Sequence, residues 1–339
     1  MHNGSVRALA AAAALGLASA TSVAVLLAAA PVGDRGDPPR IVYVARGAGA
    51  SQIAGALAEA GIIRSRWAFL GWAILRGDAR RLKPGEYEFA LPATLGAVVA
   101  RMVEGRTVIH VVTVPEGFTV RDLAGRLAAE GLANPGRIQA LAQDASFASR
   151  LGLGEASLEG YLFPDTYRLS RGMTEEEILA LMVARFREVF GAPEERKAQA
   201  LGLDRHAIII LASLIEKEAR VDGERFLISA VFHNRLRRLM PLQADPSILY
   251  SFPEKRGRLT RADLRRPDPY NTYVHPGLPP GPIANPGRAS ILAALEPAPV
   301  VYLYFVAKTD GTHAFSRTLA EHVRAVRKYQ GARREEVSG

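Results

Sequence analysis

Two acidic residues flank one lysine in LASLIEKEAR, residues 211 to 220. A carboxyl group can donate a proton at neutral pH only if its surroundings raise its pKa, and burial in an apolar environment does so. At about 100° per helical residue, Glu218 falls between Leu211 and Leu214 on the apolar face of a predicted helix. A carboxylate on such a face costs free energy unless it is paired. Glu218 is therefore the candidate catalytic acid.

The alternative for Glu218 is a buried ion pair with an arginine from another element, for which Arg225 and Arg235 are the candidates. Glu216 lies at the edge of the apolar face, four residues before Arg220. This order of charges favours an ion pair on the surface of a helix. We therefore predict a surface pair, and no catalytic role, for Glu216.

A polar, aromatic and proline-rich stretch follows this helix and offers groups that can hydrogen-bond a substrate. The candidate substrate-binding residues are Gln243, Asp245, Tyr270, Asn271 and Tyr273. Tyrosine also offers a ring face to sugars, whereas Asp245, before Pro246, has the alternative of capping a turn. The prolines from 276 to 286 predict a rigid cleft wall, with Asn285-Pro286 as the start of a helix.

Several other chemistries are excluded by composition. The chain has no cysteine, which rules out disulfides, cysteine-ligated zinc and thiol catalysis. Its seven histidines form no HExxH or other close ligand pair, so no metal site is predicted. Residues 47 to 52, GAGASQ, lack the last glycine of a dinucleotide-binding loop. No cofactor is expected.

The N-terminus predicts export. No charged residue occurs from Ala8 to Val32, a length that can span a bilayer as a helix. We predict an uncleaved transmembrane anchor over residues 1–32; a signal peptide cleaved near Ala28–Ala30 is the alternative. The net charge of +9 suits anionic lipid or an acidic polymer. No nucleic-acid motif is present, so no nucleic-acid partner is predicted.

The 339 residues allow two domains of mixed α+β structure. After a linker at 33–40, residues 41–62 recur as residues 111–132, each copy reading as a strand, a glycine turn and an amphipathic helix. Together with a strand in KPGEYEFALP, the copies predict a small repeated module over 41–140, either a binding module or a scaffold. A mixed α+β catalytic domain is then predicted over 141–334, and the repeats are predicted to be unnecessary for the chemistry.

Six blocks of sequence resemble one known family. They are LASLIEKEA, EGYLFPDTY (159–167), VFHNRL (231–236), LQADPSILY (242–250), PYNTYVHPGLPPGPIANPG (269–287) and YLYFVAKTDGTHAF (302–315). These blocks are similar to those of the MltG/YceG-like family of membrane-anchored endolytic murein transglycosylases. In that family the catalytic acid is the second glutamate of the E-K-E triplet, which corresponds to Glu218. This sequence departs from the pattern in its alanine-rich anchor and in Ala219, where a small hydroxyl residue is common.

The resemblance implies a LysM-like N-terminal module and an inner-membrane protein with its catalytic domain on the periplasmic side. The implied substrate is the glycan strand of peptidoglycan, with peptidoglycan synthases as candidate partners. The implied reaction terminates nascent strands without water: one acid protonates the leaving oxygen, the substrate's N-acetyl group assists, and the same residue deprotonates the C6 hydroxyl. The product is a 1,6-anhydro-muramyl end.

Ordinary glycosidases need a second carboxylate to activate water. If this chain were a hydrolase, Glu224 or Asp245 would be the first candidates for that role. Without the resemblance, the remaining readings are a non-catalytic, membrane-anchored peptidoglycan-binding adaptor and a basic scaffold at the membrane surface.

Overall fold

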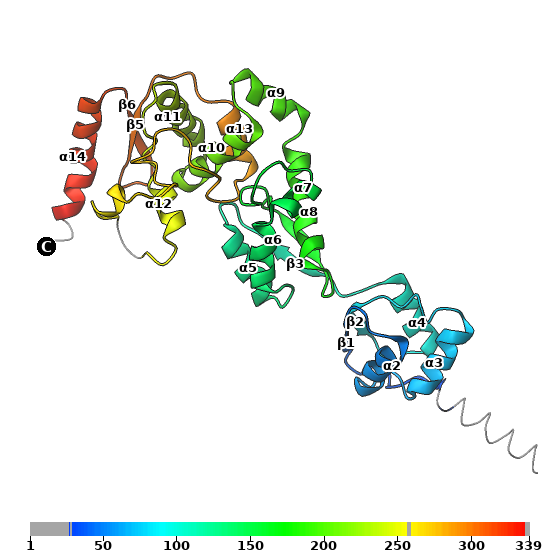
Figure 1. The fold of residues 1–339 in the computed structure, drawn as a ribbon. Coiled ribbons are helices and arrows are strands. Elements are labelled where there is room, and N and C mark those ends of the chain that lie inside the picture. Colours follow the sequence, from blue (N-terminus) through cyan, green and yellow to red (C-terminus); the bar gives the residue numbers. More distant parts are fainter. Residues whose placement is uncertain (1–26, 28, 256–258, 336–339) are drawn as a thin grey trace, which may run out of the picture. The chain divides into compact units, whose positions relative to one another are not determined.

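The computed structural model describes residues 27, 29–255 and 259–335 (Figure 1). Most of the predicted membrane anchor, residues 1–26 and 28, lies outside the described residues. Within the described ranges, no single helix is long and apolar enough to cross a membrane. The consecutive helices Ala192–Ala200 and Arg205–Glu218, which are bent by 88° relative to each other, reach that length and hydropathy only when they are taken together.

The described chain divides into two compact units. Unit 1 runs up to Val111 and also contains Arg168–Met173, whereas unit 2 contains Val112–Tyr167 and the chain from Thr174 onward. The predicted boundary at 140/141 does not coincide with this division at 111/112. Residues 112–140 belong with the unit that also contains Glu218.

Unit 1 is a small α+β unit built on one two-stranded antiparallel sheet. Its elements are β1 (Arg40–Val44), α2 (Ala50–Glu59), α3 (Arg66–Leu75), β2 (Gly85–Phe89) and α4 (Leu95–Glu104). β1 pairs antiparallel with β2, with Arg40 opposite Phe89 and Val44 opposite Gly85. Tyr87 is fully buried in the core, and its hydroxyl donates to the Lys83 carbonyl at 2.8 Å.

The two copies of the sequence repeat, residues 41–62 and 111–132, have the same local backbone structure of strand, glycine turn and helix. The second copy contains β3 (His110–Thr113) and α5 (Val120–Ala129). Gly47 and Gly117 occupy the same turn position with φ of 79° and 77°, a left-handed conformation that glycine adopts without a steric cost. However, β1 pairs with β2 whereas β3 pairs with β4 (Thr166–Leu169), and the unit boundary passes through both strands of this second sheet. The copies thus share local structure but do not form one module.

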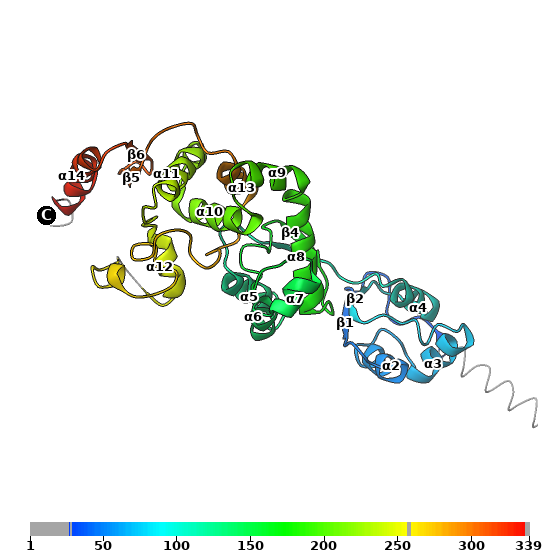
Figure 2. The ribbon, with the colours of Figure 1, turned by 45° about the horizontal axis from the view of Figure 1, so that its top comes forward.

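Unit 2 is mainly helical. Its remaining elements are α6 (Pro135–Ala142), α7 (Ala145–Arg150), α8 (Glu175–Val189), α9 (Ala192–Ala200), α10 (Arg205–Glu218), η1 (Asp222–Glu224), α11 (Arg225–Arg237), α12 (Asp245–Ser251), η2 (Asp263–Arg265), α13 (Arg288–Leu295), β5 (Tyr304–Ala307), β6 (His313–Ser316) and α14 (Leu319–Glu335). α10 packs against α11, α12 and α13 (Figures 1 and 2). β5 and β6 form an antiparallel hairpin. The predicted mixed α+β class is confirmed.

Local signals explain most helix starts. The side chain of Asp204 accepts from the Ala207 amide and caps α10, and Thr174 forms a capping box with Glu177 at α8. The predicted helix start at Asn285-Pro286 is wrong, because α13 begins at Arg288 with Gly287 as its N-cap. The Asn285 side chain is already bonded elsewhere in unit 2.

Candidate active site

The helix that carries the E-K-E triplet is buried on all sides for most of its length. Every residue from Ile208 to Ile215 is buried. An apolar stripe therefore does not by itself distinguish positions on α10. Glu218 differs because it is the last residue of the helix and lines a cavity of about 570 Å³.

Residue Glu218 as a whole is half-buried, and within the described chain its carboxyl group, at the buried end of the side chain, makes no hydrogen bond or ion pair. Burial, and to a smaller extent the charge of Asp245, raise its pKa to about 8, whereas Arg220 acts in the opposite direction. At pH 7 most molecules therefore carry the proton that a general acid needs. This arrangement supports the prediction for Glu218.

The alternative of a buried ion pair for Glu218 is wrong. Arg225 pairs with Glu216, and Arg235 donates to backbone carbonyls, among them Leu303 at 2.7 Å and Leu242 at 3.0 Å. Both arginines are thus engaged elsewhere.

Glu216 is a buried structural residue, so the predicted surface pair with Arg220 is also wrong. Its carboxylate accepts from the Gly287 amide at 3.1 Å and the Ser290 hydroxyl at 2.8 Å, and it lies 3.4 Å from the Arg225 guanidinium. The side chains of Glu216 and Arg225 are only 8% and 9% exposed. A carboxylate at the N-terminus of α13 is also favoured by the helix dipole. The pair therefore connects α10, α11 and α13, and the spacing of residues in the sequence does not predict this contact.

Three of the predicted substrate-binding residues line the Glu218 cavity: Gln243, Asp245 and Tyr273. The Tyr273 hydroxyl donates to Asp245 Oδ1 at 2.6 Å. Gln243 has a φ of 54°, and its side-chain oxygen accepts from Arg235 at 3.0 Å. A non-glycine residue in this region costs conformational energy and is typical of functional sites.

The other two candidates do not line this cavity. Asn271 is fully buried; its side-chain amide donates to the Arg266 carbonyl at 2.8 Å, and its side-chain oxygen accepts from the Tyr273 amide at 3.0 Å. The prediction that Asn271 binds substrate is therefore wrong: it shapes the loop that carries Tyr273. Tyr270 packs against Tyr250, with ring centroids 5.0 Å apart.

Two histidines that the sequence reasoning missed line the cavity, His313 and His322. The backbone amide and Nδ1 of His313 lie 2.8 Å and 2.6 Å from the Glu224 carboxylate oxygens. Glu224, one candidate second carboxylate, is thus occupied by His313. Burial and the nearby Arg235 lower the pKa of His322. The sequence signal for His313 is its place just after the Asp310-Gly311 turn between two predicted strands, where a hairpin fixes the position of its side chain.

A sequence model described as the YceG-like family matches residues 42–328. The chain belongs to the YceG-like family. It is 34% identical to the endolytic murein transglycosylase of Bacillus subtilis (strain 168) over 311 residues, 87% of this chain and 86% of that protein.

Further relatives agree with this membership. The endolytic murein transglycosylase of Streptococcus pneumoniae serotype 2 (strain D39 / NCTC 7466) is 28% identical over 85% of this chain, which spans 58% of that protein. The crystal structure of a yceG-like protein from Listeria monocytogenes is 33% identical and matches with a TM-score of 0.59, covering 84% of this chain and 98% of that one. The resemblance found in the sequence is thus confirmed.

In this YceG-like chain, Asn285 joins two of the motifs to the turn of the second repeat. Its side-chain oxygen accepts from the amides of Gly160 and Leu162, both at 2.9 Å. Its side-chain amide donates to the Phe118 carbonyl at 2.9 Å and to Glu159 at 3.2 Å. The blocks EGYLFPDTY and PIANPG therefore support the site structurally.

A second cavity of about 430 Å³ adjoins the first in the YceG-like unit 2, because Lys217, Pro246 and Leu249 line both. Glu159 lines it, and burial raises the pKa of Glu159 to about 7 against the hydrogen bonds from Val120 and Tyr250. The proline-rich stretch contributes Ile283 to this second cavity and does not line the one around Glu218. In the described part of the YceG-like chain, no group of three or more acidic or histidine side chains could hold a metal ion.

Proposed function

We propose that this chain is an endolytic murein transglycosylase that cleaves the β-1,4 bond between MurNAc and GlcNAc within nascent glycan strands. The names of its relatives support the activity. The observation that carries the assignment to a residue is Glu218, an unpartnered carboxyl group with a pKa near 8 on the wall of a cavity.

The reaction needs one group that is first an acid and then a base. Protonated Glu218 donates its proton to the glycosidic oxygen as the bond from the anomeric carbon breaks, with the substrate's N-acetyl oxygen assisting at that carbon. The C6 hydroxyl then attacks the anomeric carbon and gives its proton to the Glu218 carboxylate. One carbon–oxygen bond breaks, another forms, and Glu218 ends protonated, so no water is consumed.

The proposed cleft places Gln243, Asp245 and Tyr273 around the sugar. The hydrogen bond from Tyr273 fixes the Asp245 carboxylate, and Arg235 fixes the Gln243 amide. Side chains held in this way bind a sugar with little loss of rotamer freedom. The negative charge of Asp245 also helps to keep Glu218 protonated.

Product analysis tests the proposed reaction. Full-length protein is incubated with purified glycan strands, and the fragments are examined by mass spectrometry. We expect cleavage within strands and anhydro ends that are lighter than hydrolytic ends by one water, because the C6 hydroxyl is held near the reacting carbon. Reducing muramyl ends as the main product would indicate a hydrolase with Asp245 as its second carboxylate. Binding without cleavage would support the adaptor.

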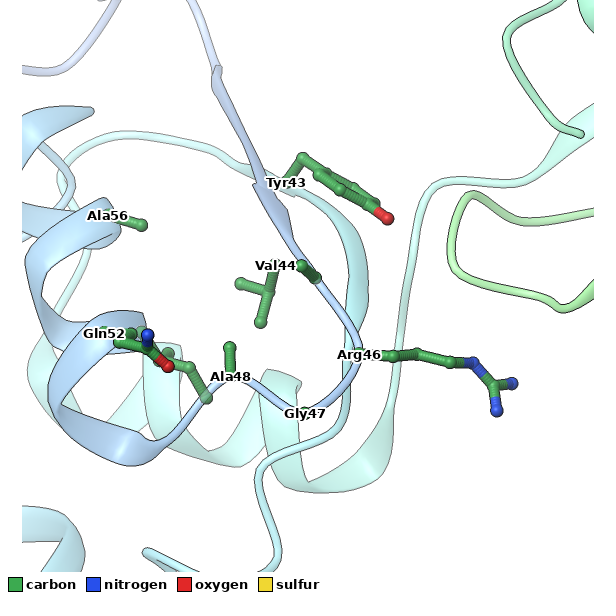
Figure 3. Close-up of a pocket in the computed structure, with 9 residues that line it drawn as sticks. Tyr43, Val44, Arg46, Gly47, Ala48, Gln52 and Ala56 are labelled. Carbon is green, nitrogen blue, oxygen red and sulfur yellow. The ribbon is translucent and has the colours of Figure 1, made fainter. Parts of the chain in front are cut away.

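For unit 1 we propose a LysM-like role in binding glycan. A cavity of about 360 Å³ lies at the turn of the first repeat copy, and Tyr43, Arg46 and Gln52 are among the residues that line it (Figure 3). The Tyr43 side chain is exposed and can stack on a sugar, and the Gln52 oxygen accepts from the Gly49 amide at 2.9 Å. Replacing Tyr43 by alanine is expected to weaken binding of glycan strands without abolishing cleavage of short ones.

The proposed location is the inner membrane, with both units on the periplasmic side and residues 1–32 as a single-pass anchor. The uncharged run from Ala8 to Val32 supports this. N-terminal sequencing of protein extracted from membranes tests it, since a start near Pro31 would mean cleavage. Peptidoglycan synthases, which supply nascent strands, are the proposed protein partners.

A further inference from the structure

Helix α3 of unit 1 presents an apolar face to solvent. Phe69 and Ala73 are buried and hold the helix to the unit. Trp67, Ile74 and Leu75, on the opposite face, are 67%, 67% and 84% exposed. Their spacing of seven and eight residues places them on one stripe of the helix. Stripes of large exposed apolar residues mark surfaces that interact with a protein or a membrane.

The surroundings of α3 are basic. Between residues 64 and 81 the sequence has five arginines against a single aspartate, Asp78. The exposed guanidinium of Arg66 lies over the Trp67 ring, 4.7 Å from its centroid. Asp78 is occupied by Arg76 and Arg81. Aromatic side chains beside arginines are typical of segments that lie at the interface between an anionic bilayer and water.

The uncharged N-terminal run reaches unit 1 next to α3. Its last residue, Val32, forms a β-bridge with Ala93, and the Pro31 carbonyl accepts from Arg64 Nε at 3.3 Å. Arg64 directly precedes the N-cap residue of α3, Ser65. A bilayer that received the run before Pro31 would therefore lie within reach of the exposed stripe. Figures 1 and 2 both show α3 beside α2 and α4 in unit 1.

We propose that α3 docks on the outer surface of the membrane, with Trp67, Ile74 and Leu75 in the interface and the arginines on anionic lipid headgroups. The helix has 10 residues, too few to span a bilayer, and so it lies in the interface plane. The docking surface is separate from the cleavage chemistry and fixes unit 1 at the membrane from which the chain extends.

The chain provides its own probe, because Trp67 and Trp72 are its two tryptophans and both belong to α3. The full chain is reconstituted into vesicles of phosphatidylglycerol and phosphatidylcholine with brominated acyl chains. We expect tryptophan emission shifted to shorter wavelength and quenched by bromine, since an interfacial helix buries its apolar face about 5–10 Å into the headgroup and acyl boundary. Quenching should persist in Trp72→Phe, which leaves Trp67 alone.

Matched variants separate the contributions. Ile74→Ser with Leu75→Ser should reduce quenching, whereas Leu319→Ser, which changes an exposed leucine of unit 2, should leave it unchanged. Replacing phosphatidylglycerol with phosphatidylcholine should also reduce the quenching of tryptophan emission. Emission typical of water-exposed indole, without quenching, would overturn the proposal. A shift to shorter wavelength without quenching would also overturn it, because a second copy of the chain would then cover the stripe.

Discussion

At the scale of residues, Glu216 and Glu218 are two acids on the same helix that differ in whether their carboxyl groups have partners. Glu218 makes no hydrogen bond or ion pair within the described chain, whereas Glu216 has an arginine, a hydroxyl and an amide. The same substitution at the two positions should therefore have different effects.

Glu218→Gln removes the transferable proton and keeps the shape of the side chain. We expect the rate of strand cleavage to fall by roughly 10³-fold or more, within the range known for positioned acids and bases. Because burial raises the pKa of Glu218, its stabilising contribution is present at low pH and lost as the pH rises through about 8. Above pH 8 the glutamine variant should therefore resist urea at least as well as the wild type.

Glu216→Gln is the control. The glutamine keeps a hydrogen-bonding oxygen for Gly287 and Ser290 but leaves Arg225 without its buried partner. We expect a loss of stability of about 2 kcal/mol, below the cost of deleting one side of a buried pair, with cleavage retained by the folded protein. If the Glu216→Gln protein were folded but inactive while the Glu218→Gln protein stayed active, the roles of the two acids would be reversed.

The pH dependence of cleavage provides a test in which two substitutions should shift the profile in opposite directions. In the proposed reaction Glu218 acts first as a protonated acid, so kcat/KM should fall as the pH rises through about 8. Asp245→Asn removes a charge that raises the pKa of Glu218, which should move the alkaline limb to lower pH. Arg220→Gln removes a charge that lowers it, which should move the limb to higher pH. Glu188→Gln is the control, because Glu188 lies on the surface of α8 and does not line the Glu218 cavity, and it should leave the alkaline limb in place. Shifts in the same direction in the Asp245→Asn and Arg220→Gln variants would contradict this account.

At the scale of elements, the site depends on a joint between segments that are distant in the sequence. Asn285→Ala leaves the buried amides of Gly160 and Leu162 without their acceptor. Each unsatisfied amide costs roughly 1–3 kcal/mol, so we expect urea unfolding to show a loss of several kcal/mol. Asn134→Ala removes only a helix cap and should cost about 1 kcal/mol. Equal losses in the two variants would mean that the joint contributes little.

Local patterns predicted the elements, but not the contacts between them. The two glycine turns, the caps of α8 and α10 and the Asp-Gly hairpin depend on neighbours within a few residues, so the sequence contains their signals. The helical wheel selected Glu218, yet α10 is buried on all sides, and Glu218 differs by ending the helix at a cavity. The partners of Glu216, Asn271 and Asn285 come from other segments, and a single sequence contains no signal for them.

At the scale of the whole molecule, the predicted start of the catalytic domain near residue 140 requires revision. A fragment that starts there lacks β3 and α5, which belong mainly to unit 2, and lacks Phe118, whose carbonyl accepts from Asn285. We expect it to show no cooperative urea transition and no cleavage. A chain that starts at Gly33 keeps these elements and should unfold cooperatively. A stable, active fragment from residue 140 would restore the earlier boundary.

Unit 1 is built from two separate segments of the chain, and this has a consequence for its folding during synthesis. Glu86, buried in unit 1, is held by His110 at 2.6 Å and by Arg171 at 3.0 Å. Arg171 belongs to the short segment Arg168–Met173, which leaves the ribosome only after residues 112–167 have been synthesised. Gly172 of the same segment approaches Gly85 so closely that a Cβ would lie 3.2 Å from its Cα. Unit 1 therefore starts to emerge first, and the buried carboxylate of Glu86, which His110 can already contact, gains Arg171 as its second partner only after residues 112–167 have been synthesised.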